Sequence, residues 1–94
     1  MSEILAQNRK LVRHLAEENG ATDVRVFGSF ARGTERPDSD LDLLIKLKPG
    51  GSLLDLVGIK QAVEDVLHRK VDVVTEGSLS PYIREQVLQE AVPL

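Results

Sequence analysis

The sequence contains no cysteine, and this absence excludes disulfides, thiolate catalysis and zinc-thiolate sites. No apolar run approaches the ~20 residues of a membrane span, and the first residues lack the apolar core of a signal peptide. Basic residues number 12 against 15 acidic ones, so no overall positive field gathers nucleic acid. We therefore expect a cytoplasmic protein with no membrane association and no direct nucleic-acid binding, whose chemistry rests on carboxylates and hydroxyls.

Length and composition predict one folded domain over residues 1–94. The chain is 41% apolar and 29% charged, which is typical of a globular protein and not of a disordered one. A domain of this size buries only about two thirds of its unfolded surface. We therefore expect any large substrate pocket to need a partner to complete it.

Helical and strand patterns alternate along the chain. The predicted order is helix, strand, short helix, strand, helix, strand, helix, over residues 2–19, 24–27, 29–32, 41–47, 52–68, 71–75 and 80–91. Alternation of this kind predicts an α/β or α+β sandwich, with helices packed on a small sheet.

Several local signals support the predicted helices. Ser52 with Asp55 three residues later is typical of a capping box, and Ser80 followed by a proline is typical of a helix start. Gly58 inside the third helix costs roughly 1 kcal/mol relative to alanine, so it either permits a close contact or weakens the helix prediction. Six apolar residues of that helix are predicted to face the core: Leu53, Leu56, Val57, Val63, Val66 and Leu67.

Isolated aromatic and histidine residues receive simpler interpretations. Phe30 and Tyr82 are predicted to pack in the interior. His14 and His68 are predicted to be exposed helix residues rather than catalytic ones, since neither lies near a motif.

Three aspartates stand out in otherwise apolar strands. Asp40 and Asp42 are separated by one residue, and residues two positions apart on a strand point to the same face. Asp72 lies between two valines that point to the opposite face. If the two strands are neighbours, the three carboxylates converge and repel one another unless a cation neutralises them. Oxygen-only ligands suit a hard ion, so the pattern predicts a magnesium site.

Gly28 and Ser29 directly follow the first predicted strand. A strand that ends in Gly-Ser and leads into a short helix presents backbone N–H groups and a hydroxyl to an anion. We therefore predict that the β and γ phosphates of a nucleoside triphosphate bind at Gly28 and Ser29. The α phosphate would then lie beside the metal, where an acceptor hydroxyl could displace pyrophosphate in line.

Each of these patterns also has a purely structural interpretation. Gly28 and Ser29 could form an ordinary turn, and Asp72 could occupy a solvated edge position. Arg32, four residues after Gly28, could be a surface residue or a salt-bridge partner that steadies the loop.

The runs GSFARG at residues 28–33 and SDLDL at residues 39–43, followed by the lone Asp72, resemble the polymerase β-like nucleotidyltransferase superfamily. The sequence is most similar to its minimal members, the antitoxin partners of HEPN ribonuclease toxins, over nearly the whole chain. This resemblance implies a nucleotidyltransferase-like α+β fold, with a small three-stranded mixed sheet packed with about four helices.

The resemblance also implies a metal site. Asp40 and Asp42 match the two metal-binding aspartates of the superfamily, and Asp72 matches its third carboxylate. By this resemblance the three aspartates are the catalytic residues, and they hold Mg²⁺, with two ions expected.

The nucleotide and the acceptor follow from the same resemblance. Gly28 and Ser29 match the triphosphate-binding pair, and Arg32 matches the arginine of the GSxxRG element. Similar minimal proteins transfer AMP from ATP to a tyrosine hydroxyl of their cognate HEPN toxin and silence it. The resemblance therefore implies an adenylyltransferase that acts as an antitoxin.

Two other functions stay open. The chain could neutralise its toxin by binding alone, with weak or vestigial catalysis. It could also be a small-molecule nucleotidyltransferase, although such enzymes carry an added domain that 94 residues cannot contain. The intact set of mutually repelling carboxylates favours the enzyme, because a pure binding protein has no need of them.

Overall fold

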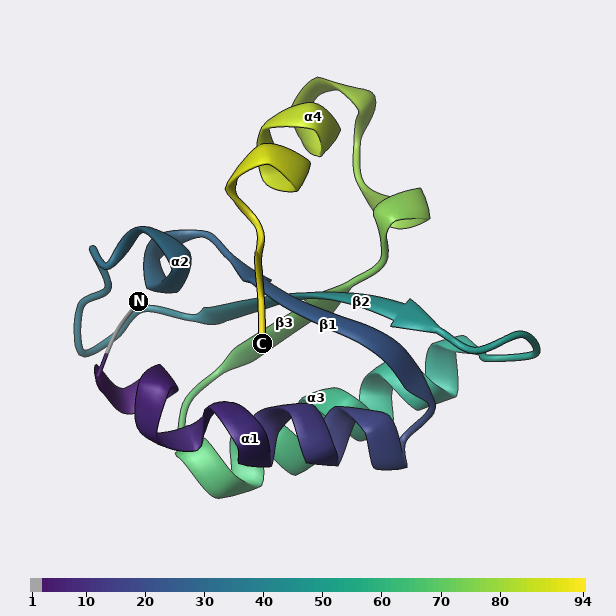
Figure 1. The fold of residues 1–94 in the computed structure, drawn as a ribbon, viewed down its shortest axis with the longest axis horizontal. Coiled ribbons are helices and arrows are strands. Elements are labelled where there is room, and N and C mark those ends of the chain that lie inside the picture. Colours follow the sequence, from purple (N-terminus) through teal and green to yellow (C-terminus); the bar gives the residue numbers. More distant parts are fainter. Residues whose placement is uncertain (1–2) are drawn as a thin grey trace.

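The predicted strands pair into one mixed sheet in the computed structural model, which describes residues 3–94 (Figure 1). The strand order is β3-β2-β1-β4. Strand β1 (Ala21–Phe27) runs antiparallel to β2 (Leu41–Leu47), whereas β2 runs parallel to β3 (Val71–Val74). The parallel pair is joined by a helical crossover, as parallel strands require. The predicted α+β arrangement, with helices packed on a small mixed sheet, is confirmed.

The sheet has a fourth strand that the sequence did not predict. Strand β4 (Val92–Pro93) pairs antiparallel with β1 through two residues, and the N–H of Leu94 donates to the carbonyl of Val24 at 3.0 Å. Two residues are too few to show a strand pattern, and proline is tolerated at a sheet edge because it needs no ladder partner there. Strand β1 also begins three residues earlier than predicted, at Ala21.

Helices α1 (Glu3–Glu18) and α3 (Leu53–Leu67) cover one face of the sheet, as Figure 1 shows. The short helix α2 (Ser29–Arg32) follows β1 directly and inserts Phe30 into the same core, where it is 2% exposed. The fully buried side chains of this core include Leu5, Val12, Val26, Leu41, Leu43, Ile45, Ile59, Val63 and Val71. None of the helices within residues 3–94 is long and apolar enough to cross a membrane.

The opposite face of the sheet is covered only in part. The 3₁₀ helix η1 (Glu76–Ser78) and helix α4 (Pro81–Glu90) follow β3 and pack a small second cluster around Leu44, Leu79 and Val87. Helix α4 begins as predicted, because the hydroxyl of Ser80 accepts the N–H of Tyr82 at 3.2 Å. The rest of this face stays open above β1 and β2.

The predicted apolar face of α3 is only partly correct. Its capping box forms, with the N–H of Ser52 donating to Asp55 at 3.0 Å. The residues that pack are spaced three or four apart, namely Leu56, Ile59, Val63 and Leu67. The predicted core residues Leu53, Val57 and Val66 are instead 74%, 54% and 38% exposed, because residues off that stripe rotate away from the sheet.

Gly58 marks a close approach of two helices. A Cβ atom built at this position would lie 2.7 Å from Oδ1 of Asn19, at the end of α1. The glycine therefore permits the close contact that the sequence suggested as one of its two explanations.

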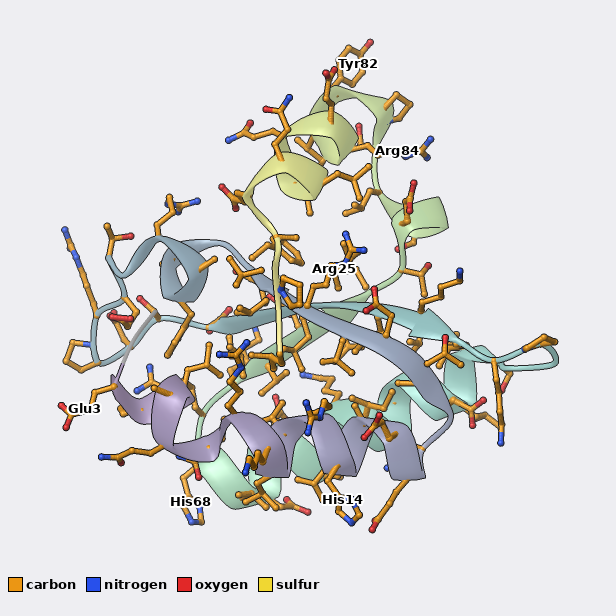
Figure 2. The ribbon with its side chains drawn as sticks, in the orientation of Figure 1. Glu3, His14, Arg25, His68, Tyr82 and Arg84 are labelled. Carbon is orange, nitrogen blue, oxygen red and sulfur yellow. The ribbon has the colours of Figure 1, made fainter. Side chains whose placement is uncertain are left out.

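The structure also tests the isolated aromatic and histidine residues (Figure 2). His14 and His68 are exposed as predicted, and Phe30 is buried as predicted. Tyr82 is 96% exposed, so the packing role predicted for it is wrong. It lies in the first turn of α4, which points away from the sheet, whereas only the later residue Val87 of that helix is buried.

Candidate active site

Asp42 and Asp72 lie opposite one another on neighbouring strands. They are register partners in the parallel pair of β2 and β3. Leu41, Leu43 and Val71 point into the main core, so both carboxylates point to the other face, the one that α4 only partly covers. The prediction that these strands are neighbours and that their aspartates share a face is confirmed.

Asp40 directly precedes β2 and is held there by an ordered turn. The guanidinium of Arg69 donates to the carbonyl of Ser39 at 2.9 Å and to two further carbonyls of residues 36–37. The same guanidinium lies 5.0 Å from the centre of the Phe30 ring, within the range of a cation–π contact. Arg69 therefore ties the approach to Asp40 to the core under α2. This role could not be predicted from sequence, because the contact joins segments about thirty residues apart.

Gly28 brings the backbone directly against the acid on β2. Its φ is +73°, a value that favours glycine. A Cβ atom there would overlap the Asp42 carboxylate, with Cγ of Asp42 only 3.2 Å away. The Gly28–Ser29 turn and the aspartates predicted from the sequence therefore belong to one site.

Glu90, the last residue of α4, completes this site, and sequence reasoning missed it. Its Oε1 accepts the N–H of Gly28 at 2.7 Å, and Nη1 of Arg32 donates to both of its oxygens, at 3.0 and 3.2 Å. Arg32 thus forms the loop-steadying salt bridge that was one of its two predicted roles.

The negative charge of the site acts most strongly on Asp42. The pKa of Asp42 is raised to about 6, first by burial and then by the carboxylates of Asp72, Asp40 and Glu90, against the opposing effect of Arg32. Lys70 contributes one cation near the rim, with its Nζ 3.9 Å from Asp40. The carboxylates therefore outnumber the cations, and a bound cation would stabilise the ionised form of Asp42.

The donor set fits a hard divalent ion that substrate also helps to hold. Carboxylate oxygens are the ligands that magnesium prefers, and Mg²⁺ is usually bound by one or two carboxylates together with substrate phosphates and waters. Among residues 3–94, no three His, Cys, Asp or Glu side chains form a group that could hold an ion by themselves. Asp42 and Asp72 suit a site in which two carboxylates bind the ion together with substrate phosphates and waters. That Asp40, Asp42 and Asp72 all act as ligands stays a prediction.

Strand β3, which carries Asp72, is clamped at its start by α3. Nζ of Lys60 donates to the carbonyl of Val71 at 2.9 Å, and Glu64 accepts the N–H of Val71 at 2.9 Å. The two side chains also pair with each other at 2.8 Å. This hydrogen bond raises the pKa of Lys60 and lowers that of Glu64. The clamp satisfies the outward backbone groups of an edge strand and fixes its register beside β2.

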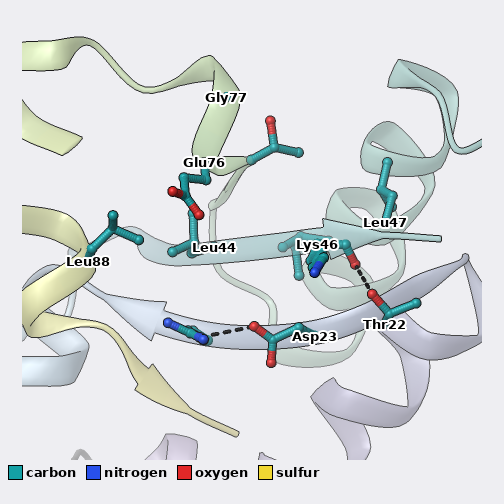
Figure 3. Close-up of a pocket in the computed structure, with 11 residues that line it drawn as sticks. Thr22, Asp23, Leu44, Lys46, Leu47, Glu76, Gly77 and Leu88 are labelled. Carbon is teal, nitrogen blue, oxygen red and sulfur yellow. Dashed lines mark hydrogen bonds and ion pairs between the residues drawn. The ribbon is translucent and has the colours of Figure 1, made fainter. Parts of the chain in front are cut away.

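A pocket of about 690 Å³ lies further along the same sheet face (Figure 3). It begins two residues beyond Asp42, at Leu44, and α4 contributes Leu88 to it. Two of its polar contacts are internal: Arg25 donates to Asp23 at 3.0 Å, and Thr22 donates to the carbonyl of Lys46 at 3.2 Å. Leu44 shares the sheet face of Asp42, so this pocket and the carboxylates lie on the same side of the sheet.

Paired carboxylates beside a glycine turn define a class of phosphate-handling enzymes that work with a divalent metal. Residues 8–94 match the nucleotidyltransferase domain family, and the chain belongs to this family. It is accordingly a nucleotidyltransferase.

Curated relatives narrow the comparison. The chain is 40% identical to "Putative protein adenylyltransferase MJ0435" of Methanocaldococcus jannaschii over 84 residues, which cover 89% of each chain. It is 36% identical to "Protein adenylyltransferase MntA" of Thermococcus cleftensis over 80 residues, which cover 85% of this chain and 81% of that relative.

Solved structures agree with this fold. The structure described as "Structure of putative minimal nucleotidyltransferase" has a TM-score of 0.87 and 51% identity, covering 98% of this chain and 94% of its own. A chain from a complex of tri-AMPylated Shewanella oneidensis HEPN toxin with MNT antitoxin has a TM-score of 0.71 and 19% identity, over 94% of this chain and 69% of that one. The second likeness shows the fold alone.

Proposed function

We propose that this chain is a magnesium-dependent protein adenylyltransferase that transfers AMP from ATP to a hydroxyl, expected to be a tyrosine, of a HEPN-type toxin. In this role it acts as a cytoplasmic antitoxin. The observation that carries the proposal is the position of Asp42. It is the register partner of Asp72 on the neighbouring strand, and its carboxylate packs directly against Gly28. This arrangement supports the proposal, because the acidic face and the Gly28 turn lie within one contact of each other.

Three residues are proposed to bind the triphosphate. Gly28 contributes its backbone N–H, and Ser29 adds a hydroxyl. Arg32 is 52% exposed at its side chain, so its guanidinium can turn toward a phosphate and donate two parallel hydrogen bonds.

Asp40, Asp42 and Asp72 are proposed to hold the magnesium, with two ions expected. When bound, the metal supplies charge neutralisation to the phosphates and lowers the pKa of the attacking hydroxyl. The raised pKa of Asp42 supports this assignment. Burial and the neighbouring carboxylates disfavour its ionised form, and a bound cation would compensate for that cost.

The transfer is an in-line displacement. The hydroxyl oxygen of the acceptor forms a bond to the α phosphorus of ATP, and the bond from that phosphorus to the bridging oxygen of pyrophosphate breaks. Pyrophosphate leaves with the bonding electrons. We assign the hydroxyl proton to Asp72, because it is the exposed member of the three aspartates and lies on the edge strand, where an acceptor can approach.

Exposed apolar side chains are available for a protein partner. Tyr82 and Ile83 on α4 are 96% and 47% exposed, and α4 ends at the proposed nucleotide site through Glu90. Leu53 and Leu54 form a second exposed group at the start of α3. We propose that the toxin contacts α4, because among the helices within residues 3–94 this one carries exposed apolar residues and also reaches the site through Glu90.

The proposal is tested by co-expressing a HEPN-type toxin with this chain and measuring the intact mass of the purified toxin. Mass increments equal to AMP residues are expected with the wild-type chain and are lost with the Asp40→Ala, Asp42→Ala double variant. An unmodified toxin in both samples, together with full protection of the cells, would instead support neutralisation by binding alone.

A further inference from the structure

Glu90 occupies the groups that are proposed to bind the triphosphate. Its carboxylate accepts the Gly28 N–H at 2.7 Å and bonds Nη1 of Arg32 through both oxygens. A carboxylate and a terminal phosphate present the same chemistry to such donors, namely anionic oxygens that accept charge-assisted hydrogen bonds. The N–H of Gly28 has one hydrogen and points at Glu90, so it cannot serve a phosphate at the same time.

We propose that Glu90 is an internal competitor of the nucleotide, and that the triphosphate of ATP binds by displacing its carboxylate from Gly28 and Arg32. This inference rests on the proposed function, since it concerns access to the same nucleotide site. Glu90 thereby limits the affinity of the free protein for ATP.

Charge repulsion disfavours binding of the triphosphate while the Glu90 carboxylate remains beside Gly28 and Arg32. Glu90 and Asp42 both lie against Gly28, since Glu90 accepts its N–H and the Asp42 carboxylate fills the space where its Cβ would be. A triphosphate that entered beside Glu90 would meet a fourth carboxylate and would leave Arg32 shared between two anions. The side chain of Arg32 is 52% exposed, so a phosphate can reach its guanidinium and replace Glu90 as the acceptor.

The same contact couples the site to α4. Glu90 is the last residue of α4, and Val87 is the only buried residue of that helix. Tyr82 and Ile83 at its other end are exposed. Release of Glu90 therefore removes a polar attachment of the helix to the Gly28 turn. By thermodynamic reciprocity, any partner that draws α4 away from Gly28 raises the affinity for ATP by the factor by which ATP favours that movement.

Calorimetric titration of the full chain with ATP and magnesium tests the competition. Glu90→Gln keeps the shape of the side chain but removes its charge, and we expect it to bind ATP at least about fivefold more tightly than wild type. Glu85→Gln is the matched control, because Glu85 is an exposed residue on the same helix and loses the same charge. ATP affinity in that control should equal wild type. Equal or weaker ATP binding by a folded Glu90→Gln protein would overturn the proposal.

A second measurement needs no variant. In wild-type protein, ATP with magnesium should shift the NMR signals of the Gly28 amide and of the Glu90 side-chain carboxyl, because the bond between them breaks. If ATP saturates the protein and neither signal moves, Glu90 is not displaced and the competition is refuted, while the proposed function stands. If neither wild type nor Glu90→Gln binds ATP, the proposed function fails as well.

Discussion

Asp42 and Gly28 constrain one another, because the carboxylate on β2 fills the space where a side chain at position 28 would lie. The acid can stand this close to the turn only if residue 28 has no Cβ. The turn in turn adopts a φ of +73°, which other residues rarely tolerate. The residues proposed for metal and for phosphate are therefore fixed by one packing contact.

This contact predicts the effect of adding one methyl group. Gly28→Ala should displace the Asp42 carboxylate, strain the turn, and destabilise the fold by about 1–3 kcal/mol. It should also abolish measurable ATP binding. Gly77→Ala is the control, since a Cβ at Gly77 meets nothing within 4 Å. Urea unfolding and ATP titration of both variants provide the measurement, and normal ATP binding by Gly28→Ala would place the phosphate site elsewhere.

Metal-free protein should lose stability as the pH rises. The folded pKa of Asp42, about 6, lies above the ordinary value of 3.8, so folding favours the protonated form. The associated stability is complete below pH ~4 and is lost as the pH rises through 6. Unfolding free energies measured with a chelator between pH 4 and 8 should therefore fall for wild type relative to Asp42→Asn. The exposed control Asp65→Asn should follow the wild-type profile, and a parallel profile for Asp42→Asn would contradict the raised pKa.

Ligand should reverse this loss of stability. A ligand that binds only the folded state stabilises it by about 2.7 kcal/mol at a concentration of 100 Kd. ATP and magnesium added together should therefore raise the melting temperature of wild type, and EDTA should remove the increase. Asp42→Asn should fold yet show no increase. An unchanged ATP–magnesium effect in that variant would exclude Asp42 from the site.

The clamp on β3 should control the strand that carries Asp72. Glu64→Gln weakens the pair with Lys60 and the acceptor for the Val71 N–H, so the amide of Val71 should exchange its hydrogen faster. The pKa of Glu64 is lowered in the folded protein, so this contribution is present at neutral pH and is lost as the pH falls through the folded pKa. Unchanged exchange at Val71 in the variant would show that β3 is held by sheet pairing alone.

The carboxylate pair could be predicted from sequence because its causes are local. A strand repeats every two residues, so Asp42 and Asp72 had to point away from the apolar residues beside them. A helix between two strands also favours parallel neighbours, which brought the two aspartates into register. The glycine turn was predictable for the same reason, since it directly ends a strand.

The remaining features depend on contacts between distant segments. Glu90 looks like any glutamate in the last turn of a helix, and only the path of α4 over the sheet brings it to Gly28. Arg69 likewise reaches a turn thirty residues away. Tyr82 has a large aromatic side chain of the kind often found in a core, but it lies outside the small second cluster under α4. Local patterns carry no information about such distances.

The most direct test of the central claim is the mass of the partner. With wild-type chain, a co-expressed HEPN-type toxin should gain whole AMP increments and lose its toxicity. With the Asp40→Ala, Asp42→Ala variant, the toxin should still be captured in a pull-down but should keep its unmodified mass and its toxicity. If the toxin stays unmodified beside the wild-type chain, or gains AMP beside the double variant, AMP transfer by these carboxylates is contradicted.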